Sequence, residues 1–367
     1  GDMENVTFKN IVINAPNRSY VGSIARNNAN TYNVELNNLN ITASDYVGAF
    51  YGYSNKTKLE GTRTIVASDI VVEGKAQTGG LIGNSNDSIS NIIINNAEVV
   101  GTANVGGVAG IAYDLLEVEA DNMNVTGDNN VGGVFGTSVY STTNRIYNKI
   151  TNSIVKGSIA RVGGLTGNSG DYGTGLRIID NCEVYGVGVN TTKVGGAIGE
   201  SGTNMRDTFV TNTIVKSTGD EVGGIVGSST NGTNDYFVSQ NNTVEGASNV
   251  GGIVGRSSGG KYSYGYVANT TVKGYSQNVS GMIGYLNNEN STAVQNLTTL
   301  NSVYSAKTNI TGEENVGGII GNLDKDLTVP ETSYLNIFVE AYIDAKNARN
   351  KSILIGSNPE KNTQFNN

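Results

Sequence analysis

The acidic side chains gather in four short groups, and paired carboxylates are what a polysaccharide-cleaving enzyme needs as acid and base. Carboxylate oxygens gathered in this way could also bind a calcium ion. Each group falls near an expected turn, so we interpret these residues as solvated turn charges and expect no catalytic and no metal site. The groups are Glu117, Glu119 and Asp121; Asp220 and Glu221; Glu313 and Glu314; and Asp324 and Asp326.

The chain contains no histidine, which excludes Ser-His-Asp, Cys-His and His-Glu-x-x-His zinc chemistry within it. Its single cysteine, Cys182, cannot form a disulfide within the chain. In the repeat described below, Cys182 occupies the column of Ala97 and Met123, so we interpret it as a small buried apolar residue. The glycine-rich stretches recur throughout the chain and no helix is expected after them. Phosphate binding is therefore not indicated, and no cofactor is expected.

Tyrosine is the main large aromatic residue, with 19 Tyr and no Trp. The densest cluster contains Tyr262, Tyr264 and Tyr266, and Tyr285 is expected close to it. Alternate residues of a strand share one face, and a tyrosine ring combines apolar area with a hydroxyl group. These four residues are therefore the candidate binding site for a host protein or a glycan. The alternative is that they are ordinary strand-forming tyrosines at the solvent boundary.

These candidates lie on a repeat of about 30 residues, a period typical of solenoids. The signature Val-Gly-Gly-Φ-x-Gly, with Φ apolar, recurs from Val21 to Val316, and a degenerate copy begins at Ser352. Short runs of Val, Ile, Thr and Tyr separated by Gly, Asn and Ser are typical of strands and turns. The sequence thus predicts an all-β, single-stranded parallel β-helix over residues 1–357, with about twelve coils and a polar tail over 358–367. Parallel β crossovers favour a right-handed coil.

One asparagine recurs at a fixed distance from the glycine of each repeat. Asparagine tolerates the left-handed backbone region, and its amide can bond to the same residue one coil above and below. We therefore predict a ladder of stacked side chains, in which Asp69 replaces one asparagine. The predicted rungs are Asn10, Asn38, Asn96, Asn122, Asn152, Asn181, Asn212, Asn241, Asn269, Asn301 and Asn336.

The same alignment predicts which side chains face inward. The fourth position of the glycine signature is uniformly apolar, as at Phe50 and Leu81, and should point into the core. The residue after each ladder position should also point inward and becomes more polar along the chain, from Ile11 to Thr213. Insertions gather between the glycine signature and the next ladder asparagine, so that side of the solenoid is the expected binding face.

The net charge is −8 and no basic run occurs, so nucleic acid is not an expected partner. No apolar stretch is long enough to span a membrane, and no membrane insertion is expected. The start, Gly1-Asp2-Met3, is followed directly by a repeat, which suggests a piece of a longer protein. We expect a monomer.

The repeat resembles the GLUG motif of bacterial surface proteins, and the resemblance covers nearly the full chain. The opening, Met3–Ile13 leading into Tyr20–Ala25, looks like the repeat region that precedes the catalytic domain of Gram-positive immunoglobulin A metalloproteases and related zinc metalloproteases. GLUG-type repeats also occur in adhesins that have no protease domain. The family's zinc motif has no counterpart here, so no catalytic residue is carried over.

The resemblance implies an extracellular location on the surface of a Gram-positive bacterium and an accessory role in recognising a substrate or host protein. The first hypothesis is therefore a non-catalytic β-helical stalk and recognition region of a larger surface protein, accessory to a zinc metalloprotease. The second is a stand-alone adhesin that binds host glycan or matrix, and the third is a polysaccharide-degrading β-helix enzyme.

Overall fold

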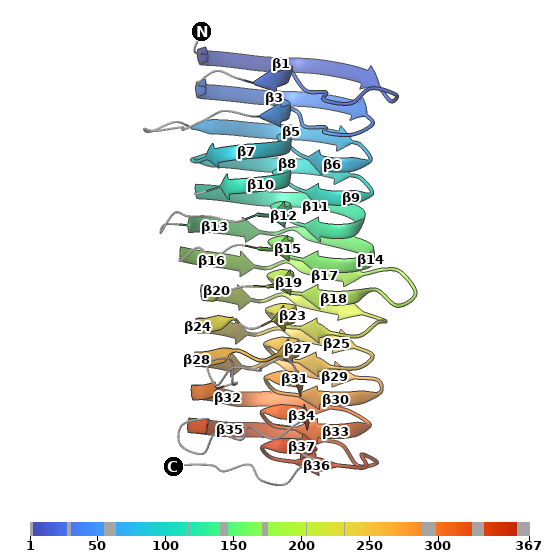
Figure 1. The fold of residues 1–367 in the computed structure, drawn as a ribbon, viewed down its shortest axis with the longest axis vertical. Coiled ribbons are helices and arrows are strands. Elements are labelled where there is room, and N and C mark those ends of the chain that lie inside the picture. Colours follow the sequence, from blue (N-terminus) through green and yellow to red (C-terminus); the bar gives the residue numbers. More distant parts are fainter. Residues whose placement is uncertain are drawn as a thin grey trace.

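The computed structural model describes residues 3–27, 31–54, 64–115, 117–139, 146–170, 175–202, 204–230, 232–287, 299–324 and 334–357. These residues contain strands and turns but no helix. The strands are parallel and form two long sheets that run the length of an elongated body (Figure 1). The predicted tail over 358–367 lies outside the described residues.

The smaller sheet has 12 strands in sequence order. They are β2 (Ile24–Asn27), β4 (Tyr51–Ser54), β7 (Ile82–Ile89), β10 (Ala109–Leu115), β12 (Phe135–Ser138), β15 (Thr166–Ser169), β19 (Ile198–Ser201), β23 (Val226–Thr230), β27 (Val254–Ser258), β31 (Ile283–Asn287), β34 (Ile320–Asp324) and β37 (Ile355–Ser357).

The larger sheet has 25 strands and bends around two sides of the body. Its longer face consists of β1 (Met3–Ala15), β3 (Thr31–Ala43), β5 (Ile65–Glu73), β8 (Ile92–Val100), β11 (Glu117–Gly132), β13 (Ile146–Thr151), β14 (Ile154–Gly163), β16 (Gly175–Asp180), β17 (Glu183–Gly186), β20 (Met205–Thr211), β21 (Ile214–Ser217), β24 (Thr233–Gln240), β25 (Thr243–Gly246), β28 (Lys261–Ala268), β29 (Thr271–Gly274), β32 (Thr299–Thr311) and β35 (Tyr334–Asp344). Its other strands lead into the glycine signature: β6 (Ala76–Gly79), β9 (Ala103–Gly106), β18 (Thr192–Gly195), β22 (Val222–Gly223), β26 (Val250–Gly251), β30 (Gln277–Ser280), β33 (Glu314–Gly317) and β36 (Lys351–Ser352).

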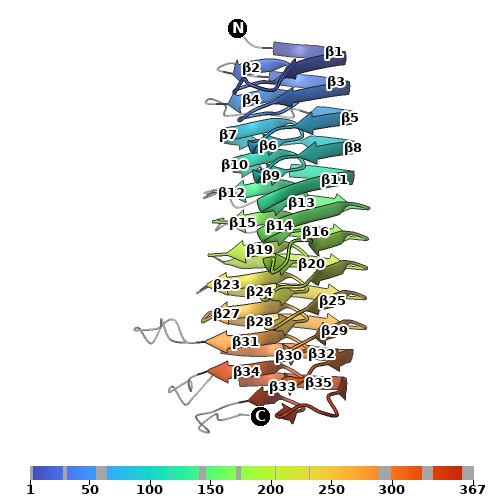
Figure 2. The same ribbon diagram turned by 90° about the vertical axis from the view of Figure 1, so that its right-hand side faces the viewer.

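Each coil contributes one strand to the smaller sheet and pairs in register with the coils before and after it. The coil made of β16, β17, β18 and β19, for example, pairs with β20, β21, β22 and β23 of the next coil. The coils stack from the N-terminal end at the top of Figures 1 and 2 to the C-terminal end at the bottom. This arrangement confirms the predicted single-stranded parallel β-helix, and one strand per coil in the 12-stranded sheet agrees with about twelve coils. The right-handed sense stays a prediction.

Three columns of residues with positive φ mark the corners of the coil. Corner 1 lies near the start of the first strand of a coil or just before it, corner 2 lies at the asparagine column identified in the sequence, and corner 3 precedes the glycine signature. Corner 1 includes Asn5, Asn33, Asn91, Asp207, Tyr236, Tyr264, Ser302 and Asn336. Corner 2 includes Asn10, Asn38, Asp69, Asn96, Asn122, Asn152, Asn181, Asn212, Asn241, Asn269 and Lys307. Corner 3 includes Tyr20, Tyr46, Gln77, Asn104, Asn130, Arg161, Lys193, Glu221, Asn249, Asn278 and Asn315.

Side-chain hydrogen bonds connect corner 2 between coils, although an aspartate replaces the asparagine acceptor at three places, Asp69, Asp121 and Asp180. The Nδ2 atom of Asn38 donates to Asn10 Oδ1 at 2.8 Å, and Asn181 Nδ2 donates to Asn152 Oδ1 at 2.7 Å. Asn152 itself donates to Asp121 at 2.6 Å rather than to the preceding corner asparagine. The asparagine column is thus a set of short ladders joined by aspartates.

Two predicted rungs are wrong. Asn301 pairs with Ser263 and has no positive φ, and it lies one residue before corner 1. Asn336 has a φ of 53° but belongs to corner 1. The corner 2 residue that follows Asn269 is Lys307, whose side chain gave no asparagine signal.

A second ladder lies inside the coil, at the residue after each corner 2 position. The backbone N–H of Thr213 donates to Asn242 Oδ1 of the next coil at 2.8 Å, and that of Met123 donates to Ser153 Oγ at 3.0 Å. Cys182 and Thr213 make the same contact at 3.4 Å. All of these side chains are buried, as predicted, and their polarity has a cause: each oxygen satisfies a backbone N–H at the corner.

The glycine signature is explained by close packing of backbone and not by positive φ, since its described glycines have none. A Cβ added at Gly107 would lie 2.0 Å from the carbonyl oxygen of Gly133 in the next coil. A Cβ at Gly110 would lie 2.6 Å from the carbonyl carbon of Gln77 at corner 3. Only glycine permits these approaches. The apolar fourth position is buried as predicted, for example at Phe50 and Leu81.

Candidate binding surface

The four predicted binding tyrosines do not form one exposed cluster. Tyr262 is only 1% exposed, because it points into the coil, where its hydroxyl lies 2.7 Å from Ser257 Oγ. Burial raises the pKa of its hydroxyl. Tyr285 lies on β31 in the other sheet and donates to Asp324 Oδ2 at 2.6 Å. Tyr262 and Tyr285 are therefore removed from the candidate site, while Tyr264 and Tyr266 remain.

Tyr264 and Tyr266 belong to a larger group on the outer face of the larger sheet, which we call the aromatic stripe. Its members are Tyr236, Tyr264, Tyr266, Tyr304 and Phe338, which are between 37% and 52% exposed. Strand pairing places Tyr266 beside Tyr304 and Tyr304 beside Phe338, one coil apart. The strands that carry them, β24, β28, β32 and β35, follow one another down the lower left of Figure 1.

Two ring contacts hold the aromatic stripe together. The rings of Tyr236 and Tyr264 stack at 4.7 Å with an interplanar angle of 9°. Those of Tyr304 and Phe338 lie 6.5 Å apart at 40°. Half-buried apolar residues continue the same outward column through three earlier coils, because Ile178 pairs with Phe209, Phe209 with Val238 and Val238 with Tyr266.

The other stripe residues carry only a weak signal in the sequence. Tyr236 and Tyr264 occupy the same position in neighbouring coils, but tyrosine does not recur at that position in the other coils as asparagine does at corner 2. Tyr304 is 40% exposed and continues the column of Tyr266 in the next coil.

The aromatic stripe begins at the side where insertions were predicted. The longer connections run from a strand of the smaller sheet to the next corner 1: β4 ends at Ser54 and β5 begins at Ile65, and β31 ends at Asn287 and β32 begins at Thr299. Tyr236 and Tyr264 are corner 1 residues. The exposed rings and the variable connections therefore share one edge of the body.

Glu117 and Glu119 line a small hollow with Tyr147, of about 180 Å³. Both carboxylates stand on β11 and face outward, as alternate residues of a strand do. Asp121, the third member of this group, accepts hydrogen bonds from Thr151 Oγ1 and Asn152 Nδ2 and so has a structural role.

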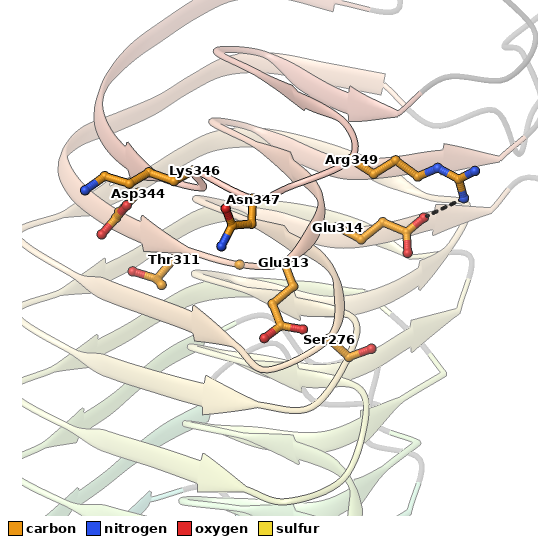
Figure 3. Close-up of a pocket in the computed structure, with 9 residues that line it drawn as sticks. Ser276, Thr311, Glu313, Glu314, Asp344, Lys346, Asn347 and Arg349 are labelled. Carbon is orange, nitrogen blue, oxygen red and sulfur yellow. Dashed lines mark ion pairs between the residues drawn. The ribbon is translucent and has the colours of Figure 1, made fainter.

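Glu313 and Glu314 line a wider hollow of about 660 Å³ near the C-terminal coils (Figure 3). Arg349 lies 3.9 Å from Glu314, and Lys346 and Asp344 stand at the opposite side of the hollow. The lining therefore carries both charge signs. Opposite charges side by side are typical of surface ion pairs, whereas a site for a charged ligand would concentrate charge of one sign.

The remaining acidic candidates also take part in structural contacts. Glu221 pairs with Arg256 at 3.2 Å, and Asp220 accepts the backbone N–H of Ser248 at 3.0 Å. Asp324 accepts from Tyr285, and Asp326 lies outside the described residues. Among the residues that the structure describes, no group of three His, Cys, Asp or Glu side chains could hold a metal ion.

Glu200 joins two cations at corner 3. Its carboxylate accepts from Lys193 Nζ at 2.5 Å and from Arg161 Nε of the preceding coil. Burial opposes ionisation of Glu200, but the hydrogen bonds and charges of Lys193 and Arg161 outweigh it and lower the pKa of this carboxyl.

The single thiol is not available for chemistry. Cys182 is buried at the interior ladder, as predicted, and burial raises its pKa to about 12. A thiol with this pKa is almost entirely protonated near neutral pH, and the thiolate is the reactive form.

No protein family, no curated protein and no solved structure matches this chain. In the described residues there is no helix of the length and apolar character needed to cross a membrane.

Proposed function

We propose that this chain is a non-catalytic recognition stalk of a larger bacterial surface protein, and that the aromatic stripe is the contact site for a protein partner. The observation that supports the proposal is the stripe itself, in which five large rings remain exposed on the neighbouring strands β24, β28, β32 and β35. The scaffold suits a stalk because a solenoid is rigid and extended and buries its core between successive coils.

The shape and composition of the stripe favour a protein partner. With its apolar continuation it crosses six coils, from Ile178 to Phe338, which at about 4.8 Å per step is about 24 Å. Aromatic residues are enriched at the centres of protein interfaces, where a few of them dominate the affinity. A strip that is only one or two side chains wide along this length has a smaller area than a standard interface, which buries about 800 Å² per partner. It would therefore form the apolar centre, with the residues around it as a polar rim.

The resemblance to GLUG-type repeats supports placing the stalk outside the cell, on the surface of a Gram-positive bacterium, beside a zinc metalloprotease domain that acts on a host protein. The contacts made by Asp121, Glu221 and Asp324 support a structural role for most of the acidic candidates and speak against a polysaccharide-degrading enzyme.

A binding assay with purified extracellular proteins tests the proposal. The chain is immobilised and exposed to immunoglobulin A, fibronectin and fibrinogen, and surface plasmon resonance measures saturable binding. We expect binding to at least one of them. The variant Y264N/Y266T/Y304T should lower that affinity at least about 100-fold, because exposed aromatic anchors each contribute strongly. Asparagine fits the positive φ at Tyr264, and threonine is a good strand former.

The matched control is Y275A, which removes another tyrosine that is 49% exposed but lies outside the stripe. It should leave the affinity unchanged. Equal loss in both variants, or no saturable binding to any of the three proteins, would refute protein recognition through the stripe.

A further inference from the structure

A second aromatic cluster lies near the N-terminal end, on a different side of the coil. The rings of Tyr20 and Tyr46 stack at 4.4 Å and 15°, and the ring of Tyr53 stands edge-on to both, at 6.0 Å and 6.3 Å. Tyr20 is 43% exposed, and the other two are partly exposed. We call these three residues the tyrosine triad.

The backbone at the triad indicates that its rings are not a product of local preference. Tyr20 and Tyr46 have φ values of 64° and 56°, in the left-handed region that bulky residues rarely adopt. Five other residues of the same corner are asparagine, which enters this region readily: Asn104, Asn130, Asn249, Asn278 and Asn315. Gln77, Arg161, Lys193 and Glu221 have the same positive φ, so this conformation belongs to the corner as a whole, and the aromatic rings are what distinguishes Tyr20 and Tyr46.

Polar groups around the triad offer both acceptors and donors. Asp45 stands directly before Tyr46, and its carboxylate accepts from Ser44 Oγ at 3.1 Å and from Ser19 Oγ at 3.4 Å. Asn86 Nδ2 donates to the Tyr53 hydroxyl at 2.8 Å.

Two amides of the next coil complete this environment. Gln77 follows Tyr46 at corner 3, and Asn84 pairs with Tyr53. In the described structure, Gln77 Oε1 and Asn84 Oδ1 have no hydrogen-bond partner, but both atoms are buried beneath the surface. The acceptor that a hydroxyl-bearing ligand could reach beside the rings is the partly exposed carboxylate of Asp45.

We propose that the tyrosine triad is a binding site for a neutral glycan. A sugar ring offers an apolar face to an aromatic side chain, and its hydroxyl groups can donate to the carboxylate of Asp45. The carboxylate of Asp45 disfavours an acidic sugar, because like charges brought together at an interface cost free energy. This inference does not depend on the aromatic stripe. Tyr53 of the triad lies on β4, and Tyr236, the first tyrosine of the stripe, lies in the coil of β27. These two strands are seven places apart in the 12-stranded sheet, which is about 34 Å.

The test uses cellotetraose, maltotetraose and chitotetraose as neutral probes and tetragalacturonate as the anionic probe. Isothermal titration calorimetry measures binding to the parent chain and to two variants. In Y20N/Y46N, asparagine keeps the corner geometry while both rings are removed. Y53A removes the edge-on ring from β4 without changing a corner residue. The control variant is Y275A, which removes a tyrosine that is 49% exposed and belongs to neither aromatic cluster.

We expect saturable binding of at least one neutral tetrasaccharide and weaker binding of tetragalacturonate. Both triad variants should weaken binding of the neutral ligand about tenfold or more, with Y275A unchanged. The proposal is overturned if no neutral tetrasaccharide binds, if the anionic probe binds best, or if the folded triad variants bind as the parent does. Because the protein assay above depends on the stripe alone, failure of either proposal leaves the other standing.

Discussion

Replacing Gly107 with alanine would place a methyl group where the structure leaves no space for it. The added Cβ lies 2.0 Å from the carbonyl oxygen of Gly133 and 2.9 Å from Met123 Cε. The first neighbour is backbone of the next coil, so the two coils must separate. Overpacking of this kind costs about 1–3 kcal/mol.

Separation would also weaken two hydrogen bonds between these coils. The Gly107 N–H donates to Gly132 O at 3.2 Å, and the Val108 N–H donates to Val134 O at 2.9 Å. At about 0.5–1.5 kcal/mol each, their loss brings the expected decrease in unfolding free energy to about 4 kcal/mol.

Urea unfolding followed by circular dichroism measures this change, and amide hydrogen exchange at Val108 locates it. The matched control is Gly202→Ala, because a Cβ there meets nothing within 4 Å. That change should alter stability by no more than about 0.5 kcal/mol. If the two variants have the same urea midpoint and the same exchange rate at Val108, the steric explanation of the glycine signature is wrong.

Three further predictions concern other columns of the coil. At corner 2, Asn241→Gly should change the unfolding free energy by a few tenths of a kcal/mol, whereas Asn241→Val should lower it by about 1–2 kcal/mol, because φ is 56° there; equal urea midpoints would contradict this. Thr213→Val should cost about 1–3 kcal/mol in thermal unfolding, because the buried N–H of Cys182 loses its acceptor, and an unchanged melting temperature would show that the interior ladder is dispensable. Glu200→Gln should be less stable than the parent at neutral pH, and the difference should shrink as the pH falls below about 4.5. The folded pKa of Glu200 is lowered from 4.5, so its stabilisation is present above that value and is lost through the folded pKa; a difference independent of pH would refute the role of its charge.

Much of the coil could be predicted because every coil has the same backbone contacts and the same buried positions. Glycine at Gly107 and an apolar side chain at Leu81 recur for steric and burial reasons, so their spacing reveals the register. The prediction failed where a different residue type occupies the corner. Lys307 has the positive φ of corner 2 but is not an asparagine, so Asn301 was predicted as the ladder residue in its place.

The candidate binding residues were harder to predict, because the rule that alternate residues of a strand share one face fails where a corner interrupts the strand. Tyr262 and Tyr264 differ by two positions, yet one is buried and the other exposed. The corner residue Tyr264 with its positive φ breaks the simple alternation between them. The tyrosine triad was not predicted, because Tyr20, Tyr46 and Tyr53 come together only when two coils are stacked.

The glycine contacts between coils also set the unit in which this molecule can change its length. Because backbone meets backbone at Gly107 and at its counterparts in other coils, the spacing between layers cannot be stretched or compressed by exchanging side chains. Duplication or loss of one repeat of about 30 residues would move everything beyond it by about 4.8 Å along the axis and leave the other layers intact. Evolution could thus adjust the reach of such a rod in fixed steps.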